Sequence, residues 1–392
     1  MPSSAAKIPR TIWLLGLVSL FMDLSSELIH SLLPAYLVGN LGVSLLTLGL
    51  LEGLAEATAQ IVKVYSGALS DYIGRRKGLL LLGYGMAALS KPLFPLASTV
   101  EWVFAARVLD RIGKGIRGAP RDALVADVAP PAIRGACFGL RQSLDTIGAL
   151  LGPALAIGLM WLLQDDTGLV MWVAVVPALL AFAVLFYGVQ EQTQIAGSSH
   201  WRTPINRALL HRLPAAYWWV VILGGLFTLA RCSEAFLLVR AQQLGLSLTW
   251  TPLVLLILAA SYSLCAYPAG RCSDRYGRAP LLALALLLLI GAELLLAAAN
   301  SVALVLLGAA IWGLHLGCSQ GILASMIADQ APAELKGSAF GLFNLSSGLC
   351  LLLASVSAGA LWHYLGAPAT FLTGALLASL SLFLLLYRWR RS

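Results

Sequence analysis

Residues 126–140 read Ala126-Asp-Val-Ala-Pro-Pro-Ala-Ile-Arg-Gly-Ala-Cys-Phe-Gly-Leu140, and residues 328–342 repeat them as Ala328-Asp-Gln-Ala-Pro-Ala-Glu-Leu-Lys-Gly-Ser-Ala-Phe-Gly-Leu342. Eight of these fifteen positions are identical, and the displacement between the two copies is 202 residues. Self-similarity at a long fixed displacement indicates an internal structural repeat. We therefore expect two halves of similar structure.

A second pair of copies supports the same repeat. The chain contains Gly67-Ala-Leu-Ser-Asp71-Tyr-Ile-Gly74-Arg75 and, 203 residues later, Gly270-Arg-Cys-Ser-Asp274-Arg-Tyr-Gly277-Arg278. Glycine permits a tight turn between two helices. An aspartate there can accept hydrogen bonds from a helix N-terminus or pair with the following arginine, Arg75 in the first copy. Parallel repetition of this kind is expected of an alternating-access transporter with its site between the halves.

The composition indicates a membrane protein. Of 392 residues, 59% are hydrophobic and 11% are charged, whereas a soluble domain has about 45–50% and about 25%. The formal net charge is +8, but the basic residues lie in short loops or within apolar runs, so we expect no nucleic-acid partner. The cysteines show no metal-binding spacing, and we expect neither a cofactor nor a resident metal.

Loop signals divide the chain into twelve apolar segments, each about long enough for the ~20 residues that a membrane span requires. The sequence predicts an all-α membrane protein with these segments: 11–38, 44–66, 78–98, 101–127, 135–163, 168–189, 215–241, 250–270, 279–299, 301–328, 338–363 and 367–388. The longest polar stretch separates the sixth from the seventh. We therefore predict an N-terminal six-helix half (1–189), a central loop (190–214) and a C-terminal six-helix half (215–392).

The orientation follows from the loops. Sixteen Lys and Arg residues fall in alternate loops on one side, and the opposite loops contain essentially none. Because positively charged loops stay in the cytoplasm, both termini and the central loop are predicted to be cytoplasmic.

The predicted spans of the first half contain many charges, each costing about 2.5–3.5 kcal/mol if exposed to lipid at the bilayer centre. The acids are Asp23, Glu27, Glu52, Glu56, Asp110, Asp122 and Asp145, and the bases are Lys63, Arg107, Arg111, Lys114, Arg117, Arg121 and Arg141. These side chains must face one another or a hydrated cavity. Arg141 and Asp145 have the spacing of an i,i+4 pair, and Lys91 lies close enough to the end of its span to reach water.

Residues near mid-membrane are the better functional candidates, because charges near the ends are as easily explained as structural pairs. In the first half these candidates are Asp23, Glu27, Glu52, Glu56, Arg107 and Arg111. In the second half, Arg231 and Glu234 occupy the repeat position of the first span, so we expect them opposite Asp23 and Glu27. Glu293 can instead be protonated or reach the surface, and we assign it no role.

The stretch Gly67-x-x-x-Asp71-x-x-Gly74-Arg75-Arg76 resembles the signature loop of the major facilitator superfamily, and the copy from Gly270 to Arg278 strengthens this resemblance. Arg107, followed by Gly113, resembles the second motif of that family. The resemblance implies a twelve-helix transporter fold of the type found in bacterial inner membranes. It also implies a conformational latch formed by Gly67, Asp71, Gly74 and Arg75 and by Gly270, Asp274, Gly277 and Arg278.

Gly148-x-x-x-Gly152-Pro153 resembles the glycine-proline motif of the antiporter branches, although only Gly158 is present where the fuller pattern has paired glycines. Small residues four apart also simply let two helices approach closely. The motif therefore favours antiport without requiring it.

These observations predict a monomeric, proton-coupled carrier in the lipid bilayer that exports a small charged or amphipathic solute. A buried carboxylate can hold and release protons, so Glu27, Glu52 or Glu56 would carry the proton. Arg107, Arg111 or Arg231 would bind an anionic solute. Two alternatives within transport stay open: a divalent-metal carrier using Asp23, Glu27, His30, Glu52 and Glu56, and an importer or symporter of an organic anion. No nucleophile-base pair is visible, so we do not expect an enzyme.

Overall fold

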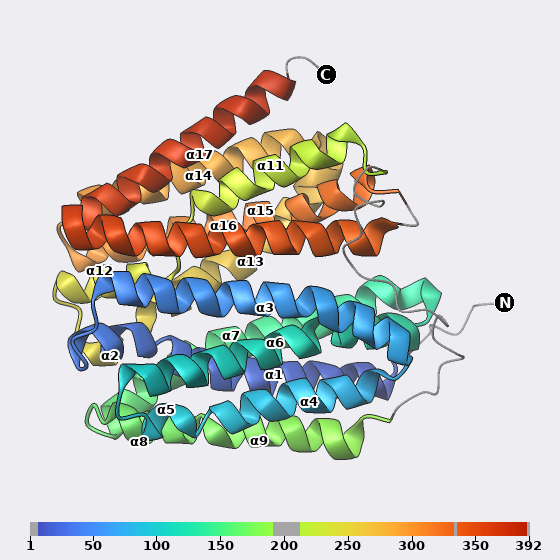
Figure 1. The fold of residues 1–392 in the computed structure, drawn as a ribbon, viewed down its shortest axis with the longest axis horizontal. Helices are drawn as coiled ribbons and strands as arrows, with labels where there is room; N and C mark the ends of the chain where they lie inside the picture. The colour runs from blue at the N-terminus through green and yellow to red at the C-terminus, as the bar shows by residue number, and fades with distance from the viewer. Residues whose placement is uncertain (1–6, 191–211, 333–334, 390–392) are drawn as a thin grey trace. The chain divides into compact units, whose positions relative to one another are not determined.

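The computed structural model describes residues 7–190, 212–332 and 335–389, and helices make up nearly all of these ranges, with no strand among them (Figure 1). Most of the predicted central loop lies outside the described residues. The helices before it are α1 (Arg10–His30), α2 (Leu33–Gly39), α3 (Leu45–Ile73), α4 (Arg76–Ser90), α5 (Leu93–Leu96), α6 (Val100–Val128), η1 (Pro131–Ile133), α7 (Arg134–Leu162), α8 (Thr167–Val173), α9 (Val175–Ala183) and η2 (Val184–Gly188).

The helices after the central loop follow the repeat. They are α11 (Ala215–Leu229), α12 (Ala235–Gln243), η3 (Leu248–Trp250), α13 (Leu253–Tyr276), α14 (Arg278–Ala298), α15 (Val302–Gln330), α16 (Lys336–Leu365) and α17 (Ala367–Trp389). α14 and α15, for example, correspond to α4 and α6.

Within the described ranges, ten helical segments are long and apolar enough to cross a membrane. Two further predicted spans are not among them. α6 has a span's length, 29 residues, but carries many charges, and the predicted span 215–241 is divided into α11 and α12. The structure is thus an all-α membrane protein consistent with twelve spans.

The predicted span 215–241 is interrupted at residues 230–234, which include Arg231 and Glu234. The Ser233 hydroxyl accepts a hydrogen bond from the Ala235 amide at 3.3 Å. Serine bonds of this kind compete with helical bonding of the backbone. The first span is also interrupted, between His30 and Leu33. Because Leu33 and Ala235 are 202 residues apart, the two breaks share one repeat position.

Packing divides the chain into two compact units. Unit 1 contains Met1–His30 and Ile61–Thr203, and unit 2 contains Ser31–Gln60 and Pro204–Ser392. α3 thus contributes to both units, and α2 packs against α12 within unit 2. The predicted halves were defined by sequence repetition, and their boundaries stay a prediction.

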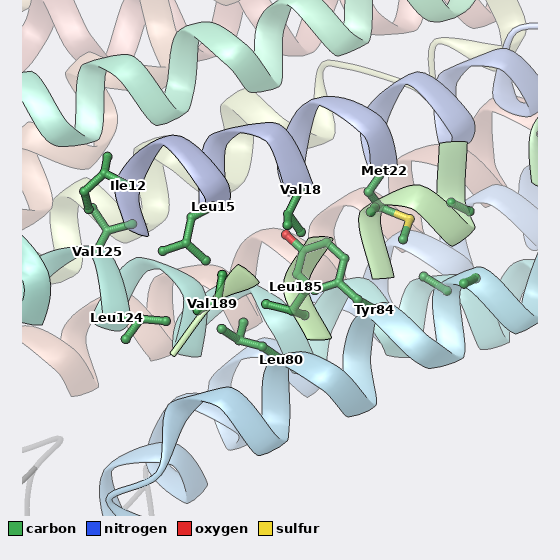
Figure 2. Close-up of a cluster of buried hydrophobic side chains, with 14 of the residues drawn as sticks. Ile12, Leu15, Val18, Met22, Leu80, Tyr84, Leu124, Val125, Leu185 and Val189 are labelled. Carbon is green, nitrogen blue, oxygen red and sulfur yellow. The ribbon is translucent and has the colours of Figure 1, made fainter. Parts of the chain in front are cut away.

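In unit 1, α1 packs against α7 and α9, and α4 packs against α6 (Figure 1). One face of α1 enters a core of apolar side chains (Figure 2). The labelled members of this core are Ile12, Leu15, Val18, Met22, Leu80, Tyr84, Leu124, Val125, Leu185 and Val189. Their packing holds α1 beside α4 and α6, and α6 carries charged residues of the site.

Candidate functional site

The contact between α1 and α7 depends on glycine. A Cβ atom added at Gly148 would clash with the Leu20 carbonyl oxygen, and one added at Gly152 would lie 2.7 Å from the Glu27 Cβ. Residues without a side chain let two helix backbones approach closely. The two glycines therefore bring α7 against the stretch of α1 that contains Asp23 and Glu27, with Pro153 buried in the next position.

Asp145 lies one turn before Gly148 and meets Asp23 in this contact. The two carboxyl groups lie within hydrogen-bonding reach of each other. Asp145 also accepts from Arg141 at 3.1 Å and lies 3.6 Å from Arg121. The predicted i,i+4 pair is thus confirmed, and Asp23 joins it across the α1–α7 contact.

Glu27 lies one turn further along α1. Its carboxylate is 3.5 Å from His30 Nδ1, and Lys114 and Arg111 on α6 lie close enough to interact with it electrostatically. The acids of α1 therefore face the cations of α6, in agreement with the expectation that charges of the first half face one another. In the part of the chain that the structure describes, no three His, Cys, Asp or Glu side chains form a set that could hold a metal ion.

The middle of α6 buries charge. Arg107, Asp110, Arg111 and Arg117 are all buried, and the Arg117 guanidinium lies 4.8 Å from the centre of the Tyr84 ring. An aromatic face attracts a cation at this distance. α6 is thus a buried row of cations held by acids and an aromatic ring.

Lys91 corrects one expectation. The sequence placed it near enough to the end of its span to reach water, but its side chain is 2% exposed. Its ammonium group donates to Asp110 at 2.8 Å and to Ser26 at 2.9 Å. Lys91 stays buried because α6 and α1 supply oxygen acceptors on both sides of it.

In unit 2, Arg231 lies in the break between α11 and α12, close enough to Glu234 and Glu56 to interact with them electrostatically. Glu52, one turn before Glu56 on α3, is buried. The structure therefore brings Glu56 of α3 to Arg231, a neighbour that the sequence did not predict.

Glu293 on α14, which the sequence left without a role, is 1% exposed. Neither carboxyl oxygen has a hydrogen-bond partner among the described residues. A Cβ atom added at Gly374 would lie 2.6 Å from the Glu293 Oε1 atom. His315 on the next helix, α15, makes a hydrogen bond through Nδ1 with the Ala285 carbonyl oxygen at 2.9 Å, and its ring stacks on Phe227. In the described part of unit 2, Glu293 is thus a buried carboxyl group without a hydrogen-bond partner.

Most of the predicted signature loop is helical. α3 continues to Ile73, and Gly74, with φ of 68°, ends it. Such a positive φ is accessible to glycine at little cost. Gly67 lies inside α3, where an added Cβ would be 3.2 Å from the Ala119 Cβ.

The partner of Asp71 is Arg76 rather than the expected Arg75. Arg76 Nη1 donates to Asp71 at 2.6 Å, and Arg76 Nε donates to Asp127 at 3.3 Å. Arg75 precedes α4 in an extended conformation and is exposed. Arg76 is favoured because it is the first residue of α4.

The second copy has the same construction. Gly277, with φ of 87°, ends α13, and Arg278 is the first residue of α14 and pairs with Asp329. Gly270 lies within α13, and the Asp274 side chain lies outside the described part of the structure. Arg278 lies 202 residues after Arg76, and Asp329 lies 202 residues after Asp127, so the two ion pairs occupy the same repeat position. The sequence analysis did not identify Asp127 and Asp329 as partners of these arginines, although both lie in the repeated Ala-Asp sequence.

A family model identifies the chain. The model of the Major Facilitator Superfamily matches residues 15–263 and 235–392. The chain belongs to the Major Facilitator Superfamily. It is therefore an integral membrane protein of a transporter family.

One relative matches nearly the whole chain, and another matches about half of it. An uncharacterized MFS-type transporter of Methanocaldococcus jannaschii is 30% identical over 387 residues, covering 97% of this chain and 95% of that protein. The multidrug resistance protein MdtH of Yersinia enterocolitica is 28% identical over 202 residues, covering 52% of this chain and 46% of that protein.

Solved structures share the superfamily fold. A POT family transporter in complex with 5-aminolevulinic acid has a TM-score of 0.82 at 14% identity, covering 97% of this chain and 96% of that one. The human organic anion transporter MFSD10 (TETRAN) has a TM-score of 0.69 at 20% identity, covering 97% and 100%. At these identities the similarity establishes the fold alone.

Proposed function

We propose that this chain is a proton-coupled secondary transporter that exports a small charged or amphipathic solute by alternating access. The observation that carries the proposal is the contact of half-buried Asp23 and Glu27 on α1 with the cations of α6. Ionisable side chains inside a membrane are costly, and they mark ion and solute pathways. We place the protein in a bacterial-type inner membrane, as a monomer with both termini cytoplasmic.

The solute is proposed to carry negative charge. Arg107 and Arg111 are buried on α6, and Arg231 lies where helical backbone bonding is interrupted between α11 and α12. A guanidinium group binds carboxylate or phosphate with two parallel hydrogen bonds, whereas an ammonium group offers a single point charge. Three arginines at such positions suit an anion better than a cation.

Two clusters of acidic residues are candidates for the site that binds the coupling proton. Asp23 and Glu27 lie on α1 in unit 1. Glu52, Glu56 and Glu234 belong to unit 2, where Arg231 neighbours Glu56 and Glu234. An arginine beside a carboxylate can exchange that carboxylate for an anionic solute, which links proton binding to solute binding. The proposed latch residues at both glycine turns would stabilise one conformation during this cycle.

The direction of transport rests on similarity to MdtH. That relative is named a multidrug resistance protein, and it matches about half of this chain. Export is therefore proposed ahead of import of an organic anion.

The test has two stages. Purified protein is first screened by thermal shift against organic anions, cationic drugs and divalent metal ions, and we expect organic anions to raise the melting temperature. The stabilising compound is then loaded into proteoliposomes. An imposed pH gradient should drive the compound across the membrane in the direction opposite to the flow of protons. Stabilisation by divalent ions alone would favour the metal carrier, and solute and proton fluxes in the same direction would favour symport. Solute flux that ignores the pH gradient would contradict proton coupling.

A further inference from the structure

The contact between Asp23 and Asp145 places two carboxyl groups against each other inside unit 1. They lie within hydrogen-bonding reach of each other, and two carboxyl groups that close favour a state in which only one is ionised. Because a carboxylate can only accept hydrogen bonds, a hydrogen bond between the two requires one proton.

The surrounding charges identify which member is ionised. Asp145 accepts from Arg141 at 3.1 Å and lies 3.6 Å from Arg121. Asp23 has no such ion pair among the described residues, and its proton can be donated to Asp145. An opposite charge at this range favours the ionised form of a carboxyl group. Asp145 is thus the carboxylate, and Asp23 carries the hydrogen.

Other charged groups face the pair from neighbouring helices. Lys114 and Arg117 on α6 interact electrostatically with Asp23, and Lys114 also interacts with Asp145. Arg121 is shared, because it also contacts Asp122 at 3.3 Å. Lys63 on α3 lies near Asp122 and Arg121. The cations of α6 are therefore positioned to receive Asp23 if its hydrogen leaves.

We propose that Asp23 and Asp145 together bind one proton and that this pair is the proton-carrying site of the transporter. This inference rests on the proposed function and assigns its coupling ion to particular atoms. It also gives a role to Asp145, which sequence analysis placed among the structural pairs.

Release of the proton changes the α1–α7 contact. The Asp23 hydroxyl gives its proton to water, and two carboxylates then face each other. The close packing at Gly148 and Gly152 holds the backbones that carry the two carboxylates near each other. Asp23 therefore turns toward Lys114 and Arg117, or α1 moves along α7. Either movement links the proton to the position of α1.

Infrared spectroscopy detects the shared proton directly. Because Glu293 is a buried carboxyl group with no hydrogen-bond partner among the described residues, it would contribute a band of its own, and all spectra use Glu293→Gln protein as the reference. Between neutral and alkaline buffer, we expect the reference to lose a carboxylic-acid C=O band. That band should be absent from Asp23→Asn protein, whose amide still donates to Asp145 and so preserves folding. Asp145→Asn should also remove or shift it. Asp122→Asn, which changes the other acid beside Arg121, should retain it.

A band that persists in both Asp23→Asn and Asp145→Asn, or a reference that shows no band at all, would overturn the proposal. Transport supplies the second measurement. Asp23→Asn should retain solute exchange across proteoliposomes without a pH gradient, and proton-driven transport should fall at least about tenfold, whereas Asp122→Asn stays within about twofold. Unchanged proton-driven transport by Asp23→Asn would overturn the assignment while leaving the proposed function intact. If the unsubstituted protein moves no protons with solute, the proposed function fails instead, and the infrared band alone then decides whether the pair binds a proton.

Discussion

Arg76, the first residue of α4, donates through Nε to Asp127 in the last turn of α6 at 3.3 Å. In the second copy, Arg278 at the start of α14 pairs with Asp329 near the end of α15. The same ion pair thus ties the same two helices together in each repeat. The repetition seen in the sequence therefore extends to individual side-chain contacts.

The two ion pairs should differ in strength. Arg76 and Asp127 have side chains that are 14% and 21% exposed, against 32% and 54% for Arg278 and Asp329. Exposed pairs contribute about 0.2–1 kcal/mol because water screens them. A double-mutant cycle of Arg76→Gln with Asp127→Asn should give a coupling near the upper end of that range, and the cycle of Arg278 with Asp329 should give less. Thermal unfolding in detergent measures both. Arg75→Gln is the control, and a loss of stability there as large as in Arg76→Gln would contradict the assignment.

The buried pair of Lys91 and Asp110 should be essential for folding. Their side chains are 2% and 4% exposed, and breaking a buried pair costs about 3–5 kcal/mol because one charge is left uncompensated. Lys91→Met should lose most of the monodisperse protein in gel filtration. Lys91→Met with Asp110→Asn should recover much of it. Glu101→Gln, an exposed acid in the first turn of α6, should have no effect. A normal yield from Lys91→Met alone would show that the pair is not needed.

Gly148 should be intolerant of a methyl group. An added Cβ would clash with the backbone of α1, and overpacking costs about 1–3 kcal/mol. Gly148→Ala should lower the melting temperature and weaken proton-driven transport, because Asp23 and Asp145 would separate. Gly158→Ala on the same helix is the matched control, since nothing lies within 4 Å of its added Cβ. Equal melting temperatures for the two variants would argue against close packing at Gly148.

Arg107 and Arg231 should not tolerate lysine if they bind the solute. Lysine keeps the charge but loses the guanidinium fork, so Arg107→Lys and Arg231→Lys should weaken transport by more than about tenfold, roughly 1.4 kcal/mol. Arg10→Lys, at an exposed arginine outside the site and the latch, should transport normally. The competing explanation is that Arg107 only pairs with an acid. It would be supported if Arg107→Glu is inactive and regains activity when Glu52, Glu56 or Asp110 becomes Arg.

Hydrophobic patterning predicted the helices closely. The expected span 135–163 appears as α7, Arg134–Leu162, because about 20 apolar residues bounded by polar loops have few alternatives to a helix in a membrane. The i,i+4 contact of Arg141 with Asp145 was predicted for a similar reason, since it depends only on the local helix.

Contacts between helices were harder to predict. The meeting of Asp23 with Asp145 depends on how α1 and α7 are rotated, which Gly148 determines by letting the backbones touch. The choice of Arg76 over Arg75 depends on which residue begins α4. The break at residues 230–234 interrupts an apolar run that hydropathy reads as continuous. Sequence patterns describe one helix at a time, and these features belong to pairs of helices.

The charge carried by α6 also bears on how the protein is made. α6 does not meet the hydropathy of a membrane span, and each charge costs about 2.5–3.5 kcal/mol when a translocon inserts a helix alone. Lys91, the partner of Asp110, is synthesised before α6, whereas Asp145, the partner of Arg121, emerges only with α7. We therefore expect α6 to partition poorly into lipid by itself. Biogenesis of this region would then be a cooperative event in which several helices enter the bilayer together.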